Sequence, residues 1–115
     1  MTHDPDCLFC KIVAGKIPSR KAYEDEQVLA FHDIHPWAPV HLLIIPKLHI
    51  ATMSDLGDEH ADLLGHMALL APRLMQEQGV TNGFRTVINT GPDGGQEIYH
   101  LHMHVMGGPR PWVKA

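Results

Sequence analysis

Residues 100–106, His-Leu-His-Met-His-Val-Met, alternate imidazole and apolar side chains. Side chains of a β-strand point alternately to the two faces of its sheet, so this period of two predicts a strand over 99–106. All three histidines would then lie on one face, about 6.6 to 6.8 Å apart and roughly 13 Å from first to last. One small ion therefore cannot bind all three of them, and at most a neighbouring pair can share it.

Size and charge exclude several classes of protein. The 115 residues fit a single domain, which we place at 1–115, and 44% hydrophobic residues are enough for a globular core. A formal net charge of -4 argues against a face that binds nucleic acid. No segment has the ~20 apolar residues of a membrane span, and the N-terminus is acidic where a signal peptide is basic. We therefore expect a cytoplasmic protein without membrane contact.

Apolar spacing and turn signals predict the secondary structure. The pattern indicates a short helix, a long helix and three strands besides 99–106, at 7–13, 58–78, 28–33, 41–45 and 84–90 respectively. Gly79 can close the long helix as a C-cap. Pro72 has no N–H to donate to the carbonyl of Ala68, so we expect a kink or an early end there. The predicted class is α+β, mostly antiparallel.

The segment 89–97, Asn-Thr-Gly-Pro-Asp-Gly-Gly-Gln-Glu, joins the strand at 84–90 to the histidine strand. Glycine backbone can approach a ligand closely, and consecutive N–H groups in a turn form a concave site that suits an anion. The simpler interpretation is an ordinary hairpin loop. The neighbouring histidines favour the anion site.

Cys7 and Cys10 are the only cysteines, and they are three residues apart. This spacing is compatible with half of a zinc site, with a redox dithiol, or with two small buried residues. Redox motifs of this spacing usually follow a strand in a βαβ unit, whereas this pair precedes every predicted strand. We therefore discount the redox interpretation.

Taken together, the motifs resemble a known family. The pattern at 100–106 looks like the motif of the histidine triad superfamily of nucleotide-binding hydrolases and transferases. Segments 31–34, 38–41, 45–47 and 94–96, with Asn89, Tyr99, Gly107 and Gly108, extend the resemblance to its Hint branch across nearly the whole chain. The resemblance implies an antiparallel sheet of about five strands with two helices, continued across a homodimer. It also implies hydrolysis of purine nucleoside 5'-phosphoramidates.

The same resemblance assigns catalytic roles. His102 would attack the α-phosphorus and form a nucleotidyl-histidine, which water then hydrolyses. An imidazole with a pKa of about 6.5 is largely neutral at pH 7 and can act as this nucleophile. The backbone carbonyl of His100 would fix the tautomer of His102. His104, His41 and Asn89 would polarise the phosphate or position the leaving group.

The resemblance also assigns the nucleotide-binding residues. Apolar side chains would hold the base, namely Leu8, Phe9, Ile12, Phe31 and Ile34. Asp33 would accept from the ribose hydroxyls, because a carboxylate can accept from two vicinal hydroxyls. Gly95, Gln96 and Glu97, with Asn89, His102 and His104, would surround the phosphate. Without the resemblance, the apolar residues are more simply interpreted as core.

Two residues depart from the family's common pattern. Glu97 stands where some members have a serine near the phosphate, and His35 stands where a small polar residue is usual. An ionised Glu97 would repel a phosphate unless its side chain points away. Its backbone N–H is therefore the better candidate for the contact.

A zinc ion is the one cofactor that the resemblance implies, at one per chain and without any organic cofactor. Its ligands would be Cys7, Cys10, His49 and His100. Such a closed tetrahedral site is structural, because no position is left for water. It leaves His102 and His104 free for catalysis.

Three other functions compete with the phosphoramidase. A metallohydrolase would use His100 and His102 to hold a catalytic zinc that activates water. A nucleotide-sensing dimeric module would bind purine nucleotides with only incidental turnover. A dinucleoside polyphosphate hydrolase would use the same nucleophile on another leaving group.

Overall fold

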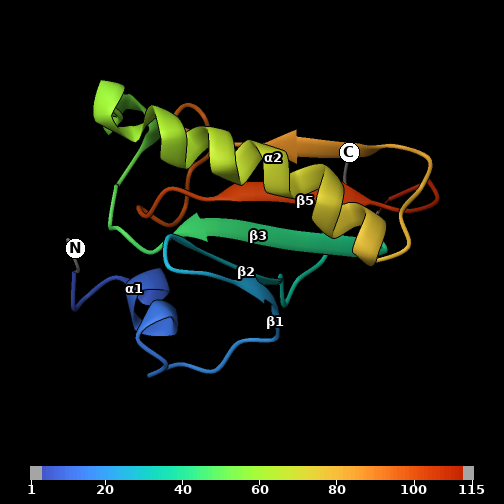
Figure 1. Cartoon of the computed structure of the whole chain (residues 1–115), viewed down its shortest axis with the longest axis horizontal. Helices are drawn as coiled ribbons and strands as arrows, with labels where there is room; N and C mark the ends of the chain where they lie inside the picture. The colour runs from blue at the N-terminus through green and yellow to red at the C-terminus, as the bar shows by residue number, and fades with distance from the viewer. Residues whose placement is uncertain (1–3, 113–115) are drawn as a thin grey trace.

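The structure, a computed structural model, describes residues 4–112 and is built round a five-stranded sheet (Figure 1). All neighbouring strands are antiparallel, in the order β1-β2-β3-β5-β4. In chain order the elements are α1 (Leu8–Val13), β1 (Lys21–Glu24), β2 (Val28–His32), β3 (Val40–Pro46), the 3-10 helices η1 (Met53–Asp55) and η2 (Asp58–His60), α2 (Ala61–Glu77), β4 (Phe84–Val87) and β5 (Met103–Gly107). The predicted α+β class and the two helices are confirmed.

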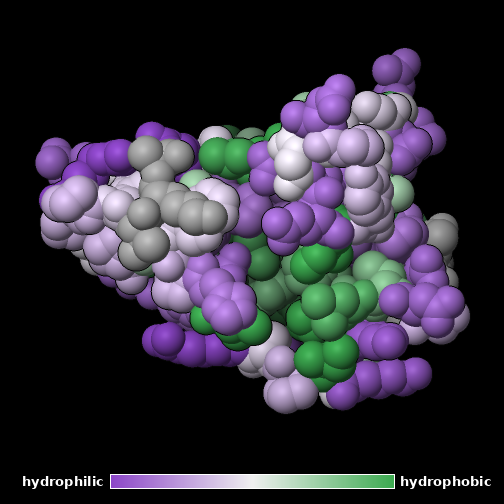
Figure 2. Space-filling model, turned by 180° about the vertical axis from the view of Figure 1, so that it is seen from behind, coloured by the Kyte–Doolittle hydropathy of each residue, from purple (hydrophilic) through white to green (hydrophobic). Residues whose placement is uncertain are grey.

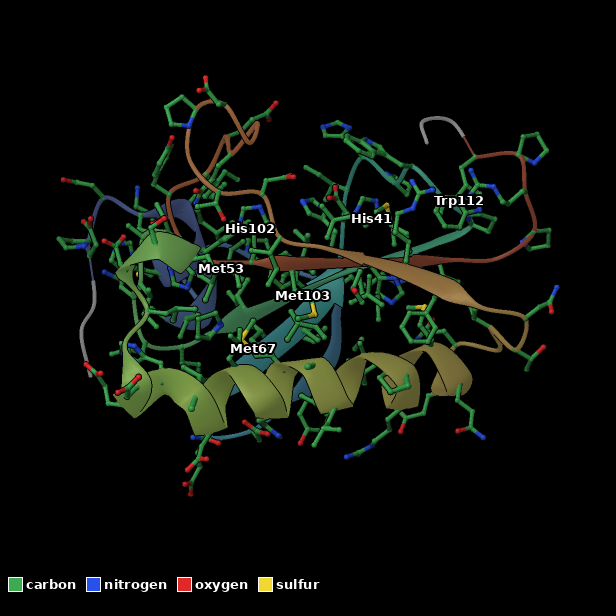
Figure 3. The ribbon with its side chains drawn as sticks, turned by 90° about the horizontal axis from the view of Figure 1, so that it is seen from above. His41, Met53, Met67, His102, Met103 and Trp112 are labelled. Atoms are coloured by element: carbon green, nitrogen blue, oxygen red, sulfur yellow. The ribbon has the colours of Figure 1, made fainter. Side chains whose placement is uncertain are left out.

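The central strand β3 is buried on both faces. Leu42 and Ile44 belong to the core beneath α2, whereas Leu43 and Ile45 belong to the core beneath α1. Figure 3 shows the same division: Met67 and Met103 lie between α2 and the sheet, and His41 and His102 lie on the opposite side. A strand covered on both faces has no polar side to show, which explains its continuous apolar sequence.

The helix α2 begins at Ala61, after the 3-10 turn η2, and runs through Pro72 to Glu77. Of the two outcomes expected at Pro72, the early end is therefore excluded. Packing holds the helix on both sides of the proline, since Leu70, Ala71, Leu74 and Met75 are all buried. Gly79, at a φ of 82°, follows the helix as predicted, in the left-handed conformation that glycine adopts most easily.

The strand predicted over 99–106 begins only at Met103, so the expectation that one strand carries all three histidines is wrong. His100 and His102 lie in the irregular segment before β5. The N–H of Leu101 donates to the carbonyl of Ile50 at 2.7 Å, which takes this segment away from the ladder of β3 and β5. Of these three histidines, only His104 lies in a strand.

Two strands at the edges of the sheet differ from prediction. β4 ends at Val87, three residues before the expected Thr90. β1, over Lys21–Glu24, was not predicted, because its four residues are exposed or half-buried and show no apolar alternation. No helix in residues 4–112 is long and apolar enough to span a membrane.

Asp25 connects α2 to the turn between β1 and β2. Its Oδ2 accepts from His66 Nε2 at 2.7 Å and from the Tyr23 hydroxyl at 2.8 Å. Its Oδ1 accepts from the N–H groups of Gln27 and Val28 at 2.8 and 2.9 Å. Burial alone would raise the pKa of Asp25, but these hydrogen bonds outweigh it and hold the pKa well below its usual range.

We expect Asp25→Asn to lower the free energy of unfolding by about 1 to 3 kcal/mol at neutral pH, because a charged acceptor with several donors is lost. The lowered pKa means that the contribution of Asp25 is present above about pH 4 and is lost as the pH falls further. Urea unfolding at pH 7 and pH 3 measures both effects. Asp93→Asn, in an exposed loop, is the control. Equal losses in the two variants would contradict the role of Asp25.

Candidate active site

A cavity of about 380 Å³ opens on the face of the sheet opposite α2. Figure 2 shows this face, where apolar side chains gather round a hollow. The apolar lining comes chiefly from α1 and the neighbouring strands, with Leu8, Phe9, Ile12, Phe31 and Leu43. The polar lining includes Asp33, Asn89, Glu97, His102 and His104. The lining thus combines an apolar wall with several hydrogen-bonding side chains, two of which are carboxylates.

The structure brings together all but one of the residues that the resemblance assigned to the nucleotide. Gln96 is the exception, because it does not line the cavity. Its amide donates to the carbonyls of Ala51 and Ile98 at 2.8 and 3.0 Å and accepts from Gly91 at 3.0 Å. The side chain of Gln96 therefore fixes the segment 91–98 against Ala51.

The turn before the histidines offers fewer donors than expected. The N–H of Gly95 donates to Pro92 at 3.1 Å, and that of Gln96 donates to Gly91 at 3.0 Å. The N–H of Glu97 makes no hydrogen bond with any residue in 4–112. Among the three residues proposed for the phosphate, Glu97 is thus the one whose backbone donor is available.

The apolar residues predicted for the base pocket have two roles. Phe9, Ile12 and Phe31 are buried members of the α1 core and also line the cavity. Leu8 and Ile34, by contrast, are 43% and 85% exposed at the cavity rim. The three buried residues therefore belong both to the core and to the pocket, because the core extends to the cavity wall.

His41 and His104 form one hydrogen-bonded chain with the backbone. The N–H of Trp37 donates to His41 Nδ1 at 3.0 Å. Because an amide N–H can only donate, His41 carries its proton on Nε2, which lies 2.9 Å from His104 Nδ1. His104 Nδ1 must then accept, so neutral His104 carries its proton on Nε2. This leaves the Nε2–H of His104 as a donor at the cavity.

His102 has the opposite tautomer. Its Nδ1 lies 2.7 Å from the carbonyl oxygen of His100, which can only accept, so the proton is on Nδ1. The Nε2 of His102 therefore carries a lone pair. The rings of His102 and His104 have centroids 5.1 Å apart. One imidazole thus presents a lone pair to the cavity and its neighbour presents an N–H group.

Burial keeps two of these histidines uncharged. Burial, together with the nearby His102 and His41, lowers the pKa of His104 to about 4 although Asp33 opposes this shift. Burial also lowers the pKa of His41, and the carboxylate of Asp33 at 3.5 Å only partly offsets the effect. Both imidazoles are therefore neutral at pH 7.

Asp33, His41 and His104 lie close enough together to suggest a metal site, with one ligand atom of each within 4.8 Å of the others. The positions of the protons on the histidine rings argue against a metal ion there. His41 Nδ1 already accepts from the Trp37 N–H, so Nε2 holds the proton of the neutral ring and has no lone pair for a metal. These three residues form a hydrogen-bonding network.

A second group, Cys7, Cys10, His49 and His100, has the geometry of a metal site. The sulfur-to-nitrogen distances are 3.3 Å from Cys7 to His100 and 3.4 Å from Cys10 to His49, and the two Nδ1 atoms are 3.2 Å apart. Tetrahedral zinc, with bonds of about 2.3 Å to sulfur and 2.0 to 2.1 Å to nitrogen, requires roughly 3.5 and 3.3 Å for these distances. The four residues can therefore bind a metal ion.

Local structure arranges these ligands. Cys7 is the N-cap of α1, and its sulfur accepts from the N–H of Cys10 at 3.3 Å, so both sulfurs face the same side of the first turn. His100 Nε2 donates to the carbonyl of Pro46 at 2.7 Å, which leaves Nδ1 unprotonated towards the sulfurs. Burial raises the pKa of the Cys10 thiol, so a bound cation would favour its thiolate.

The same contacts argue against a catalytic zinc on His100 and His102. Both ring nitrogens of His100 are directed elsewhere, Nδ1 to the cysteines and Nε2 to Pro46. His102 turns its Nδ1 to the carbonyl of His100. The two side chains therefore do not face a common position for an ion.

Trp37 is a site residue that the sequence prediction missed. Its ring lies nearly parallel to that of His104, at 14° with centroids 6.2 Å apart, and it lines the cavity. An available signal was its position in Pro36-Trp37-Ala38-Pro39, where prolines disfavour a regular element, four residues before His41. Packing in the core does not explain a large aromatic residue in such a turn, so its presence there indicates a role at the site.

Comparison with known proteins gives consistent matches. A family model described as scavenger mRNA decapping enzyme C-term binding matches residues 6–112. Protein HitA of Neisseria gonorrhoeae is 50% identical over 104 residues, covering 90% of this chain and 97% of that protein. The purine nucleoside phosphoramidase of Escherichia coli K12 is 44% identical over 104 residues, covering 90% and 87%. A HIT family hydrolase from Legionella pneumophila has a TM-score of 0.88 at 49% identity, covering 91% and 95%.

The hydrogen-bond chain predicts how His104 titrates. We expect its ring to stay neutral, with the proton on Nε2, until the pH approaches about 4. Nitrogen-15 NMR of histidine-labelled protein between pH 8 and pH 4 reports both charge and tautomer. The reference is the ordinary imidazole pKa of about 6.5. A His104 that titrates near this ordinary value, or that carries its proton on Nδ1, would contradict the hydrogen-bond assignment.

Proposed function

The chain belongs to the histidine triad family of nucleotide hydrolases, and we propose that it hydrolyses purine nucleoside 5'-phosphoramidates through a nucleotidyl group carried on His102. The observation that carries this proposal is the pair of opposed tautomers on His102 and His104 at one cavity. The related purine nucleoside phosphoramidase of Escherichia coli supports the substrate class.

In the first step the Nε2 lone pair of His102 attacks the α-phosphorus. The Nε2–P bond forms, the P–N bond breaks, and its electron pair goes to the leaving nitrogen. The Nε2–H of His104 donates a hydrogen bond to that nitrogen and stabilises the charge that develops on it. The proton that the leaving amine needs comes from solvent, because donation by a neutral imidazole would leave an imidazolate anion.

In the second step water attacks the phosphorus of the nucleotidyl-histidine. The Nε2–P bond breaks, the nucleoside monophosphate leaves, and the protons of the attacking water pass to solvent and to the released amine. The carbonyl of His100 keeps the proton of His102 on Nδ1, so Nε2 is the nitrogen that accepts and releases phosphorus.

The nucleoside would lie against α1. Phe9 and Phe31, in edge contact with centroids 5.6 Å apart, form the apolar wall for the purine. Asp33 Oδ1 accepts from the N–H of His35 at 2.8 Å, and a carboxylate has further lone pairs for the ribose hydroxyls. Asn89 and the N–H of Glu97 would contact the phosphate.

We also propose that Cys7, Cys10, His49 and His100 hold a structural zinc ion. With four protein ligands the site has no place for water, so the ion would supply folding energy. Every bond-making and bond-breaking step above belongs to side chains outside this group, and His100 contributes to those steps only through its backbone carbonyl. We further propose that residues 1–115 form a single domain and that the protein is cytoplasmic.

His102→Asn should remove the nucleophile and leave the Cys/His group intact. We expect hydrolysis of adenosine 5'-phosphoramidate to fall by several orders of magnitude, while zinc content, Tm and affinity for AMP are retained. Stopped assays, metal analysis and calorimetry measure these quantities. In wild-type protein quenched during turnover, peptide mass should show the nucleotidyl group on His102. Normal turnover by the variant would refute the assignment.

His100→Asn is the matched variant, since it changes the neighbouring histidine but removes a zinc ligand. Zinc affinity and Tm should fall first, and any loss of activity should follow from the disturbed segment before β5. If this variant keeps full zinc and stability yet loses the reaction, the metallohydrolase must be preferred.

A homodimer is the remaining part of the proposal. β4 is an edge strand of the sheet, and its first residue, Phe84, is 42% exposed. An uncovered edge with an apolar side chain favours pairing with a second copy. Sedimentation at micromolar concentration should therefore give a dimer, and Phe84→Lys should shift it towards monomer. A wild-type monomer under these conditions would exclude the dimer.

A further inference from the structure

We propose that the leaving group of the substrate carries a negative charge, which Arg85 and Arg110 recognise beside Trp112. This inference rests on the proposed hydrolysis at His102 and specifies the class of leaving group. The three side chains line a second cavity, of about 720 Å³, together with residues 79–84, Gly108 and Pro109, so this cavity adjoins the β4 edge at which we place the second copy. None of these residues has a role in the steps described above.

The register of the sheet places Arg85 on the face that carries the histidines. Arg85 pairs with Met106, which pairs with His41, and paired residues of neighbouring strands share a face. His104 lies two residues along β5 from Met106, on the same face. From strand spacings, the Cα atoms of Arg85 and His104 are roughly 8 Å apart. A group bound at His104 is therefore within reach of a long arginine side chain.

The second cavity lies in the direction in which a leaving group would depart from His102. Figure 3 shows His102, His41 and Trp112 in this order along one side of the sheet. The first cavity, in which we place the nucleoside, lies at the His102 end, because α1 contributes to its lining. In an in-line displacement the leaving group departs away from the nucleophile. The side chains around Trp112 are thus the ones that a departing group extends towards.

Trp112 is held in a defined position. Its Nε1 donates to the carbonyl of Gly108 at 3.1 Å. Gly108 has a φ of 110°, and a Cβ there would lie 2.7 Å from the side chain of Pro39, so only glycine allows this approach. The guanidinium carbons of Arg110 and Arg85 lie 4.4 and 5.3 Å from the centre of the indole ring. Both cations are therefore fixed on one aromatic platform.

The two arginines lack a counter-charge. Neither forms an ion pair with any residue between 4 and 112, although the chain as a whole has a formal net charge of -4. A guanidinium stacked on a ring keeps its N–H edge free and can bind a carboxylate or a phosphate through paired hydrogen bonds. A leaving amine with a carboxylate and a second phosphate group share this chemistry.

The experiment compares leaving groups of matched size. Three adenosine 5'-phosphoramidates carry β-alanine, β-alanine amide and 1,3-diaminopropane, which end in a carboxylate, a neutral amide and an ammonium group. A dinucleoside polyphosphate tests phosphate in the same place. The kcat/KM values are measured for the wild type, Arg85→Gln, Arg110→Gln and Arg73→Gln. Arg73 stacks on Tyr23 at 5.0 Å, so it is a matched control for loss of a stacked arginine.

We expect wild-type protein to prefer the carboxylate over the amide by about tenfold or more, and the ammonium compound to be the poorest. Arg85→Gln and Arg110→Gln should each lose most of this preference, whereas Arg73→Gln should keep it. Using the ratio of two substrates cancels any general loss of activity. A larger effect on the dinucleotide than on the carboxylate would identify phosphate as the natural charge.

Two results separate this inference from the proposed function. If the amide compound is hydrolysed but the carboxylate preference is missing, or survives both substitutions, the inference is overturned and the phosphoramidase stands. If wild-type protein hydrolyses none of the compounds, the phosphoramidase fails. Calorimetry of AMP and ADP then tests the arginines alone: a gain in affinity for ADP that Arg85→Gln removes supports the anion site, and equal affinities overturn it.

Discussion

His100 joins three parts of the molecule through its own polar atoms. Its Nδ1 faces the sulfur of Cys7 at 3.3 Å, its Nε2 donates to Pro46 at the end of β3, and its carbonyl accepts from His102. The segment leaves the sheet before β5 begins, because the N–H of Leu101 donates to the carbonyl of Ile50, and this departure orients His102 at the cavity. A single fully buried residue thus sets the position of the cysteine group and the tautomer of the proposed nucleophile.

The sequence predicted most where burial sets the pattern. The helical spacing beneath α2 and the apolar run of β3 follow directly from a sheet covered on both faces. It predicted less where backbone contacts decide. The N–H of Leu101 bonds to Ile50 and ends the strand pattern early, and no periodicity reveals a contact between residues so far apart. β1 was missed because a short exposed edge strand has no apolar signature.

The candidate site shows the same division. The residues that the resemblance assigned to the nucleotide line one cavity except Gln96, whose amide donates to the carbonyls of Ala51 and Ile98. The resemblance overlooked Trp37, whose side chain and N–H both act within the site. Motifs identify which residue types occur together. Which face of a loop each one presents is set by hydrogen bonds that the motif does not contain.

The donor that fixes His41 is a main-chain N–H, and this has a consequence for how such a site can evolve. Every residue except proline offers that donor, so position 37 can change its side chain without altering which nitrogens carry protons. A substitution at position 37 can therefore change the size and polarity of the cavity wall beside His104 without moving the protons of His41 and His104. The shape of the cavity and the tautomers of its histidines depend on different parts of one residue, its side chain and its backbone N–H.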